Sequence, residues 1–508
     1  MLQITNSRVL CLIALLTSTI FLVSCGDDDD DSNSSETSTP LPSLDTQLQS
    51  VISDQGLSGD PSTGRQIPDI NTPVAQLGKK LFFTKSLGGD TDTACVSCHH
   101  PVLGGGDDLS LSIGTGATLP DHLGPSRTHS SAAPNFDGGP TIPRNAPTTF
   151  NCAIWDQMMF HDGRIESLGK TPNANGNDGQ GIRTPDSKLG IADPQAGLDL
   201  AAAQSRFPVT SPEEMRGFDF EAGNSNDDVR NALARRLVDQ SIPNTWLVEF
   251  QQAFDSSEDA ANLITFANIA EAISAYERSQ LFVNSPWKKY VEGDQAALSE
   301  AAKKGALLFF QSIEEGGANC VDCHKGDFFT DEQFHVLAIP QIGRGNGDGE
   351  TGDNDFGRFR ETQNPQDKYA FRTPSLLNVE VTWPYGHSGA YLSLEEVVRH
   401  NFNVEDAINR YDFTLSQLDA GIQHEHAEEN TRAALAQLKT NRANGLTPVI
   451  QDIDLSDEQV TYLVEFLLAL TDPCVKDRDC LAPWIADTND AGPDSLQLNA
   501  EFSDLTGF

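Results

Sequence analysis

The chain has 508 residues, with 34 Lys and Arg against 74 Asp and Glu, which gives a formal net charge of −40. This acidic balance disfavours nucleic acids and anionic membrane surfaces as partners. The length suits two domains of ordinary size with insertions, and the charge fits either steering of a basic partner or a generally acidic exported protein.

The first segment has the pattern of a bacterial secretion signal. An apolar run from Leu10 to Leu22 follows Arg8, and Cys25 comes directly after Leu-Val-Ser, which resembles a lipoprotein cleavage box. The run is short for a membrane span, which needs about 20 residues, although an uncleaved anchor is the alternative. We therefore predict a signal peptide over residues 1–24, lipidation of Cys25, and a lipid anchor to the bacterial envelope, in the periplasm or at the cell surface.

Two polar segments flank the rest of the chain. Residues 25–65 are acidic, rich in Ser, Thr and Pro and poor in apolar residues, and they are predicted to be a disordered tether with no core of its own. Residues 476–508 are predicted to be an acidic tail.

The pattern between these ends is helical. Apolar residues recur at helical spacing within residues 264–281, and Ser456 is a plausible N-cap of a final helix that runs to Leu470. Three stretches rich in Gly, Pro, Asn and Asp are predicted to be long loops over this helical body: residues 103–143, 169–196 and 340–368.

Two copies of the motif Cys-x-x-Cys-His are the most informative feature of the chain. The two copies are Cys95, Cys98 and His99, and Cys320, Cys323 and His324. In each copy two thiols can bond the vinyl groups of a haem, and the histidine can ligate its iron. We therefore predict two covalently bound haem c groups, and their attachment outside the bacterial cytoplasm agrees with the export signal.

Two other uses of paired cysteines fit the pattern less well. Structural zinc ligands usually cluster within a few tens of residues, whereas Cys98 and Cys320 lie far apart. A thioredoxin-like redox pair does not require a histidine directly after the second cysteine in both copies.

A weak internal repeat suggests that the two haems belong to related domains. Residues 77–83 and 303–310 are both rich in Lys, Gly, Leu and Phe, and each segment precedes a haem motif. Two ordinary amphipathic helices are the alternative. We predict an N-terminal haem domain over residues 66–285 and a C-terminal one over residues 286–475.

The remaining cysteines are assigned by their spacing. Cys474 and Cys480 lie close together and are predicted to form a small disulfide loop in an oxidising compartment, with two free thiols as the alternative. Cys152 is left over, and we predict that it is a small buried side chain rather than a reactive one.

The order of further segments around the haem motifs resembles that of the bacterial di-haem cytochrome c peroxidases, a family that includes the MauG-like enzymes. The resemblance runs from about Leu77 to Leu470. The matching segments are residues 77–83, 144–148, 160–164, 211–215, 371–376 and 382–387. The resemblance implies a mostly α fold with two cytochrome c-like haem domains and long loops.

The resemblance also implies a division of labour between the haems. Peroxide reacts at the N-terminal haem, on His99, and the C-terminal haem, on His324, receives electrons from a donor. Family enzymes place a Gln and a Glu ten positions apart on the open side of the first haem, and Gln204 and Glu214 have this spacing. The Glu would move a proton between the peroxide oxygens. A solvated carboxylate at a helix start is the alternative for Glu214.

A calcium site is implied as well. Family members hold this ion between the haem domains through one Asn side chain and two backbone carbonyls, and the matching positions are Asn145, Thr382 and Pro384. Oxygen ligands suit a hard cation. A turn residue before Ala-Pro is the alternative for Asn145.

Two departures from the family pattern concern histidines. The family usually has a Trp before Asp-Gly-Arg as an electron relay between the haems, and this chain has His161 there, whose imidazole is much harder to oxidise. Many members also block the first iron with a loop histidine. His122 and His129 lie in the corresponding loop, and a surface histidine is the alternative for each.

A third departure concerns the second iron. The chain has four methionines: Met1, Met158, Met159 and Met215. Family peroxidases use a Met from the C-terminal half as the sixth ligand of the second haem, which raises its potential. Asn401 falls nearest to this position, which is a Tyr in MauG-like members. His400 is adjacent and is a candidate sixth ligand, with His387 and an open site as competitors.

The sequence thus predicts a peroxidase that reduces hydrogen peroxide to water with electrons from a small donor protein, such as a cytochrome c or a cupredoxin. One alternative is a MauG-like oxidase that acts on a protein or a small molecule. Another is a di-haem electron carrier without catalysis. The oligomeric state is left open, with a homodimer as one candidate.

Overall fold

A computed structural model describes residues 42–239, 242–446 and 451–502. The predicted signal peptide and Cys25 lie outside the described residues. Residues Ser43–Phe508 form one compact unit. Within the ranges described, no helix is long and apolar enough to cross a membrane.

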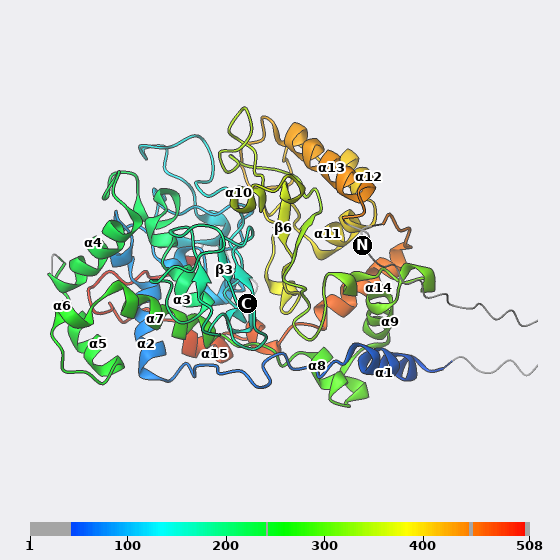
Figure 1. The fold of residues 1–508 in the computed structure, drawn as a ribbon, viewed down its shortest axis with the longest axis horizontal. Coiled ribbons are helices and arrows are strands. Elements are labelled where there is room, and N and C mark those ends of the chain that lie inside the picture. The colour runs from blue at the N-terminus through cyan, green and yellow to red at the C-terminus, as the bar shows by residue number, and fades with distance from the viewer. Residues whose placement is uncertain (1–41, 240–241, 447–450, 503–508) are drawn as a thin grey trace, which may run out of the picture. The chain divides into compact units, whose positions relative to one another are not determined.

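The prediction of a mostly α fold is confirmed (Figure 1). The α-helices are α1 (Leu44–Gln55), α2 (Pro73–Phe83), α3 (Leu200–Ser205), α4 (Asn226–Val238), α5 (Trp246–Ala253), α6 (Ala260–Leu263), α7 (Phe266–Arg278), α8 (Pro286–Val291), α9 (Glu300–Phe310), α10 (Phe359–Thr362), α11 (Leu394–Phe402), α12 (Val404–Arg410), α13 (Ala427–Ala443), α14 (Asp457–Leu468) and α15 (Arg478–Leu481). The strands are β1 (His122–Leu123), β2 (Met158–Met159), β3 (Ile165–Ser167), β4 (Ile182–Arg183), β5 (Phe334–Val336), β6 (Ala370–Arg372) and β7 (Glu501–Phe502). They form three small sheets: parallel β1–β7, antiparallel β2–β3–β4 and antiparallel β5–β6.

Helices α2 and α7 form the centre of the first haem domain. They cross at Gly78, where an added Cβ would lie 1.8 Å from the carbonyl oxygen of Ala272. Only a residue without a side chain lets the two backbones approach so closely. The apolar faces of both helices are buried in one core, as the helical spacing in residues 264–281 predicts.

Helices α9 and α14 repeat this arrangement in the second haem domain. They cross at Gly305, where an added Cβ would lie 1.8 Å from the carbonyl oxygen of Tyr462. Their apolar faces are buried in a second, separate core. Ser456 caps α14 by accepting a hydrogen bond from the Gln459 amide, so the predicted final helix and its cap are confirmed.

Part of the segment predicted as a tether has a different structure. Residues Leu44–Gln55 form α1, whose Leu48 is fully buried in the second core. The carboxylate of Asp45 accepts hydrogen bonds from Tyr290 (2.8 Å) and lies 2.6 Å from the ammonium of Lys303. The polar composition concealed an apolar stripe that packs against α9.

The predicted acidic tail also differs from the structure. Residues 471–502, here called the C-terminal strap, return from the second domain to the first (Figure 1). The indole of Trp246 donates a 2.8 Å hydrogen bond to Asp494 in the strap, and Leu498 is buried in the first core. The strap begins with the disulfide that joins Cys474 to Cys480.

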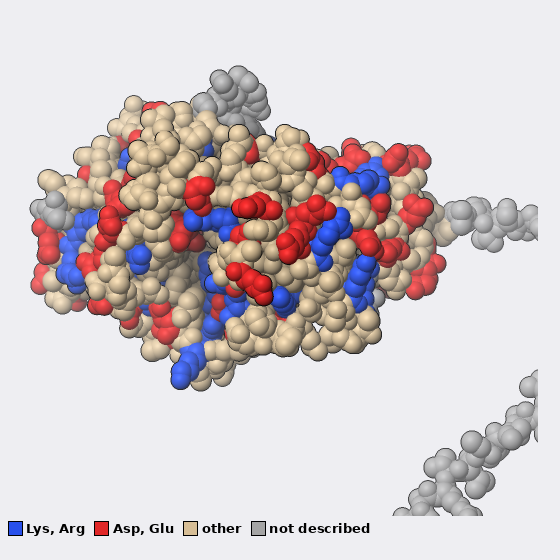
Figure 2. All heavy atoms as spheres, turned by 90° about the horizontal axis from the view of Figure 1, so that it is seen from above, with Lys and Arg blue, Asp and Glu red and all other residues tan. Residues whose placement is uncertain are grey.

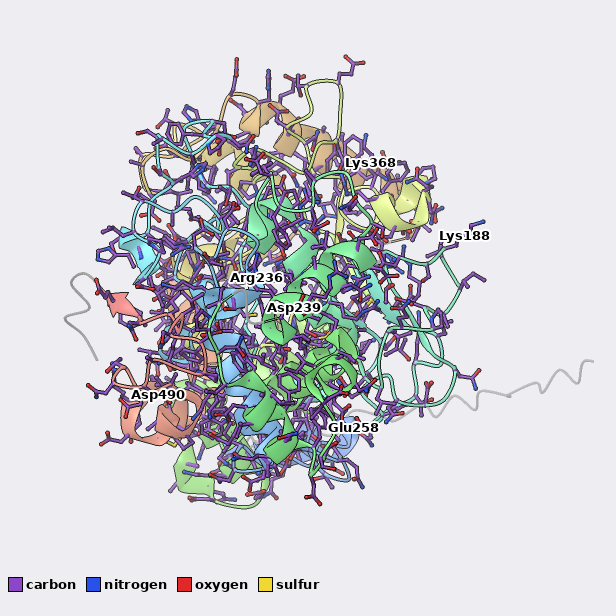
Figure 3. All side chains as sticks on the ribbon, turned by 90° about the vertical axis from the view of Figure 1, so that its left-hand side faces the viewer. Lys188, Arg236, Asp239, Glu258, Lys368 and Asp490 are labelled. Atoms are coloured by element: carbon purple, nitrogen blue, oxygen red, sulfur yellow. A yellow bond between two sulfur atoms is a disulfide. The ribbon has the colours of Figure 1, made fainter. Side chains whose placement is uncertain are left out.

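Acidic and basic side chains are intermixed on the surface. The face in Figure 2 shows Lys and Arg among Asp and Glu rather than one continuous acidic patch. Lys188 extends from an exposed loop between β4 and α3 (Figure 3). The net charge of −40 is therefore not gathered into one patch on that face.

Candidate functional site

The first Cys-x-x-Cys-His motif forms one tight turn. Cys95–Ser97 is a 3-10 turn, and the amide of His99 donates to the carbonyl of Cys95 (3.2 Å). Nδ1 of His99 lies 3.1 Å from the carbonyl oxygen of Gly105. A proton on Nδ1 makes this hydrogen bond and leaves Nε2 free as an iron ligand.

The second motif repeats this geometry. Cys320–Asp322 is a 3-10 turn, and the amide of His324 donates to the carbonyl of Cys320 (3.0 Å). Nδ1 of His324 lies 3.0 Å from the carbonyl oxygen of Phe329. All four motif thiols are free. Two thiols and one oriented imidazole per turn fit the attachment of one haem c to each motif.

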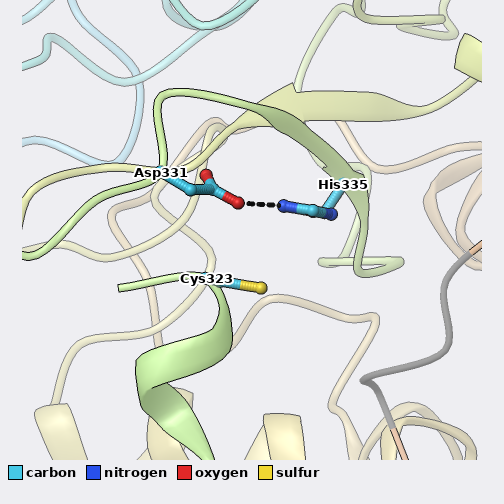
Figure 4. Close-up of side chains that lie close together, drawn as sticks. All are labelled: Cys323, Asp331 and His335. Atoms are coloured by element: carbon cyan, nitrogen blue, oxygen red, sulfur yellow. Dashed lines mark hydrogen bonds and ion pairs between the residues drawn. The ribbon is translucent and has the colours of Figure 1, made fainter. Parts of the chain in front are cut away.

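A third group near the second motif could suggest a metal ion. Cys323, Asp331 and His335 bring one ligand atom each within 4.8 Å of one another (Figure 4). Haem attachment uses the Cys323 sulfur, however, and the remaining two ligands are too few for a structural zinc site. Burial alone would lower the pKa of His335, but its 2.8 Å hydrogen bond to Asp331 raises that pKa to about 10. The pair is best described as a half-buried ion pair beside the second haem motif.

Glu214 lies on a turn that touches the first motif. The turn Pro212–Arg216 follows Ser211, whose hydroxyl accepts from the Glu214 amide (3.3 Å). Sδ of the next residue, Met215, lies 4.0 Å from Sγ of Cys95. Glu214 therefore occupies a helix start, as the alternative interpretation has it, and also lies next to the first haem motif.

The environment of Glu214 combines burial with one cation. Its side chain is 24 % exposed, and its Oε1 lies 3.8 Å from the guanidinium of Arg164, which stacks over the Phe160 ring. Burial raises the pKa of Glu214, and the charge of Arg164 opposes this increase. A carboxyl with a raised pKa can accept a proton and return it near neutral pH.

Gln204 approaches the same region from α3. Helix α3 ends one residue after Gln204, and the turn Pro208–Thr210 then leads into the turn that carries Glu214. No hydrogen bond joins the side chains of Gln204 and Glu214, both of which the structure describes. Their roles as a distal pair remain a prediction.

A buried ion network joins the two domains behind Glu214. Arg144 donates to Asp355 from Nε (2.6 Å) and Nη2 (2.8 Å), and to Asp162 from Nη1 (2.6 Å). Burial alone would raise the pKa of both carboxyls, but Arg144 holds each below its usual value. Arg144 lies in a segment that resembles the family. Its ion pair with Asp355 could not be predicted from the sequence, because 211 positions separate the two residues.

His161, which stands where the family usually has Trp, lies beside this network. Its Nε2 donates to the carbonyl of Asn145 (3.0 Å), and its own carbonyl accepts from the Arg372 amide (2.8 Å). Burial and the charge of Arg144 lower the pKa of His161 to about 4. His161 is therefore a neutral imidazole at the domain boundary.

The predicted calcium ligands are only partly arranged for a cation. The Asn145 side chain donates from Nδ2 to the carbonyl of Leu109 (2.9 Å), and its backbone amide donates to His387 (2.9 Å). Thr382 and Pro384 lie in the segment that leads to His387. The calcium site remains a prediction.

The candidate sixth ligands of the second iron are occupied by hydrogen bonds. His400 is fully buried, its Nδ1 accepts from the Tyr391 hydroxyl (2.7 Å), and its Nε2 donates to the carbonyl of Leu337 (2.8 Å). His387 stacks on Phe371 at 3.7 Å, and Asn401 donates to its own helix. In this arrangement His400 has no ring nitrogen free for iron.

The two loop histidines have contacts of their own as well. His122 lies in β1, which pairs with β7 of the strap. Nδ1 of His129 lies 3.0 Å from the carbonyl of Gly139, and the ring lines an open cavity of about 300 Å³ together with Asp92 and Phe218. Neither His122 nor His129 is placed as an iron ligand here.

Comparison with known proteins agrees with this geometry. Residues 72–296 match the sequence model of a family described as di-haem cytochrome c peroxidase. Over these residues the chain is similar to the di-haem cytochrome c peroxidase and MauG family.

Relatives in the family differ in their names. The chain is 27% identical over 326 residues to the methylamine utilization protein MauG of Methylorubrum extorquens, which covers 64% of this chain and 67% of that protein. It is also 27% identical over 332 residues to the cytochrome c551 peroxidase of Pseudomonas aeruginosa, covering 65% of this chain and 71% of that protein. Such identities support the family and leave the choice between peroxidase and MauG-like roles open.

Solved structures show the same fold. A MauG-like protein associated with microbial copper homeostasis aligns with a TM-score of 0.52 at 24% identity, over 83% of this chain and 98% of that chain. The di-haem peroxidase BthA of Burkholderia thailandensis aligns with a TM-score of 0.51 at 20% identity, over 86% and 92%.

Proposed function

We propose that the protein is a di-haem c-type peroxidase that reduces hydrogen peroxide to water at the first haem. The observation that carries the proposal is the half-buried Glu214, one residue from Met215, which contacts Cys95. The second domain repeats the proximal turn but offers hydrogen-bonded His400 instead of an available carboxyl. Glu214 therefore places a carboxyl with a raised pKa beside the first motif, whereas the pKa of Asp331 beside the second motif is lowered.

The residues of the chain have separate tasks in this reaction. The haem irons would supply the electrons and the open coordination position for peroxide. Glu214 accepts a proton from one peroxide oxygen and returns it to the other, so that the O–O bond breaks toward water. Arg164 keeps the carboxylate oriented, and Gln204 is proposed to complete the distal side. His99 and His324 would hold the two irons through Nε2.

The second domain is proposed to receive electrons, one at a time, from a small exported cytochrome c or cupredoxin. The proposed location follows from the secretion signal and Cys25, which would anchor the protein to the bacterial envelope by lipid. Calcium at Asn145, Thr382 and Pro384 and assembly as a homodimer belong to the same proposal.

The test is peroxide turnover by the lipid-free holoprotein with a reduced small cytochrome c as donor. Haem content from the pyridine haemochrome spectrum comes first, and two haems per chain are expected. Peroxide-dependent oxidation of the donor supports the proposal. Two attached haems without donor oxidation would contradict it.

A MauG-like oxidase is the second candidate, and one observation favours it specifically. No methionine follows Met215, and Asn401 falls nearest to the position of the usual ligand. Unless Met158, Met159 or Met215 reaches across from the first domain, the second haem would lack the thioether that raises its potential. A smaller potential gap would let both haems share oxidising equivalents. Peroxide addition to the fully oxidised protein, followed by optical and EPR spectra, distinguishes the candidates, because only the MauG-like enzyme should change at both haems together.

A further inference from the structure

Helix α7 carries a buried carboxyl that has no task in the proposed reaction. Glu277 is 6 % exposed, and its Oε2 has no hydrogen-bond partner. Gln280, which lies just past the end of α7, is fully buried, and its Nε2 has no partner either. Unpaired buried polar atoms are costly and rare in native proteins, so two adjacent ones require an explanation.

The carboxyl lies close to the first haem motif. Burial raises the pKa of the Cys95 thiol, and the charge of Glu277 is the second cause of that increase. Burial, and next the charge of Glu277, also raise the pKa of the Cys152 thiol. Glu277 therefore acts electrostatically on the side of the first haem site that is formed by Cys95.

Hydrogen bonds connect the neighbouring glutamine to the iron-ligating histidine. The carbonyl of Gly105 accepts from Nδ1 of His99 (3.1 Å) and from the amide of Thr149 (3.2 Å). The Thr149 hydroxyl then donates to Oε1 of Gln280 (2.9 Å). The residue three positions after Glu277 is thus in contact with the hydrogen-bond partners of His99.

The surrounding groups favour a neutral carboxyl that can change its charge. Burial, and next the charge of Asp199, raise the pKa of Glu277 to about 8. Asp199 caps α3 and is itself paired with Arg278 at 2.9 Å. The charged and titratable groups around Glu277 are Cys95 from the motif turn, Cys152 from the turn before β2, Asp199 from α3, and Tyr276 and Arg278 from α7.

Arg278 also offers a connection to solvent. One of its terminal nitrogens binds Asp199, and the other donates to the carbonyl of Gln66 at the surface (2.8 Å). Its Nε, which is buried, has no partner. The unpaired atoms of Glu277, Arg278 and Gln280 therefore follow one another along the same end of α7.

We propose that Glu277 is a redox-linked proton site of the first haem. When the iron on His99 gains one electron from a one-electron donor, Glu277 takes one proton from solvent, and it releases that proton when the iron is oxidised. The net charge of the buried site then stays constant, which avoids adding an uncompensated charge in a low-dielectric interior. Gln280 and Thr149 act as positioning residues between this carboxyl and His99.

The inference rests on haem attachment at Cys95 and Cys98 in the proposed function, but not on peroxide chemistry. The test is therefore a redox titration of the two-haem protein without peroxide, repeated from about pH 6 to pH 10 so that both sides of the pKa range are covered. A proton gained with each electron makes the midpoint potential of the first haem fall as pH rises. Because reduction raises the pKa of Glu277, the fall is confined to the interval between its oxidised-state and reduced-state pKa values.

Two matched variants separate this effect from the general charge of the helix. In Glu277→Gln the pH dependence of the first haem should disappear, whereas the second haem should titrate as in the unmodified protein. Glu271→Gln removes the same charge at an exposed position of α7 and should leave both haems unchanged. A pH dependence that persists in Glu277→Gln would overturn the proposal.

A second measurement applies if Glu277→Gln fails to fold or to attach haem. Infrared difference spectra of the unmodified protein, reduced minus oxidised, should gain the carbonyl band of a protonated carboxyl. Burial also raises the pKa of Asp107 and Asp108, near the first motif, to about 7. Labelling with ¹³C-glutamate should shift the band and so excludes these two aspartates, and the band should persist in Glu214→Gln. If no glutamate band appears, the proposal is wrong whatever the peroxidase activity.

Discussion

The two haem domains share their proximal construction and differ on the opposite side. Each has a helix crossing at a glycine, a 3-10 turn with two thiols, and a histidine whose Nδ1 binds a backbone carbonyl. Only the first domain adds a half-buried glutamate on a turn that touches its motif. In the second domain the buried candidate, His400, is fixed by two hydrogen bonds.

The proposed division of tasks between the two haems requires such a difference within one scaffold. The proximal turn depends on local sequence, so repeating it attaches a second haem in the same way. The distal side is formed by segments that come later in the chain, and these can change without disturbing attachment. If one haem reacts with peroxide and the other transfers electrons, we expect a carboxyl near the first haem. Near the second haem we expect a histidine whose two ring nitrogens are both hydrogen-bonded.

The largest effect is expected where the two domains meet. In Arg144→Met two buried carboxylates, Asp162 and Asp355, lose their cation, and the free energy of unfolding should fall by about 3–5 kcal/mol, the usual cost of an uncompensated buried charge. Denaturant unfolding measures this loss. Arg432→Met, which removes an exposed pair with Glu428, should change little.

Acid titration gives an independent check on the same network. The pKa values of Asp162 and Asp355 lie below the usual value when folded, so their stabilising contribution is complete above the unfolded pKa of about 4 and is lost as pH falls through the folded values. The unmodified protein should therefore lose stability in acid more steeply than Arg144→Met. Parallel acid profiles for the two proteins would contradict this account.

Removing the distal carboxyl should break the asymmetry between the domains. Glu214→Gln is expected to lower peroxide turnover by about 10²-fold or more, with both haems still attached, because general acid–base catalysis is lost. Since burial raises the pKa of Glu214, turnover of the unmodified protein should decline on the acid side at a higher pH than an exposed glutamate would give. Glu396→Gln, an exposed helix-start glutamate of α11, is the matched control in the second domain. Full turnover in Glu214→Gln would remove Glu214 from the mechanism.

Equal effects are expected at the two glycine crossings. Gly78→Ala and Gly305→Ala each place a Cβ 1.8 Å from a carbonyl oxygen of the partner helix, and each should cost about 1–3 kcal/mol through forced helix separation. Thermal unfolding measures the cost. Gly106→Ala, with its nearest neighbouring atom at 3.4 Å, serves as the tolerated control. If one crossing tolerates alanine and the other does not, the domains do not share this construction.

Local features of the fold could be predicted from the sequence, whereas long-range ones could not. The helical spacing in residues 264–281 and the cap at Ser456 are determined by near neighbours, and both are confirmed as α7 and α14. The polar composition of residues 44–55 did not predict helix α1. The helix is stabilised by the burial of Leu48 against a helix about 250 positions away, which the local sequence does not indicate. The structure of the strap could not be predicted for the same reason. The Asp494 carboxylate accepts hydrogen bonds from Thr84 and Trp246, which lie far away in the sequence.

The candidate site shows the same limit. The Cys-x-x-Cys-His motifs predicted His99 and His324 as iron ligands, but the nitrogen left available follows only from the Nδ1 contacts with Gly105 and Phe329 in the structure. The network of Arg144 depends on a residue of the other domain. One hydrogen bond of His400 is donated to the carbonyl of Leu337, 63 positions earlier in the chain, and local sequence spacing does not predict such a contact.

The smallest effect is expected at His400, and it decides how the second haem is completed. Since both ring nitrogens are bonded, His400→Leu should lower the free energy of unfolding by about 1–3 kcal/mol, by leaving the Tyr391 hydroxyl and the Leu337 carbonyl unpaired. The EPR spectrum of the second haem should stay as it is. Tyr391→Phe removes one of these hydrogen bonds but keeps the imidazole, so it should cost less and also leave the spectrum unchanged. If His400→Leu alters the spectrum of the second haem and Tyr391→Phe does not, His400 moves onto the iron when haem is bound, and the asymmetry between the domains lies in ligand exchange rather than in a fixed hydrogen-bonded histidine.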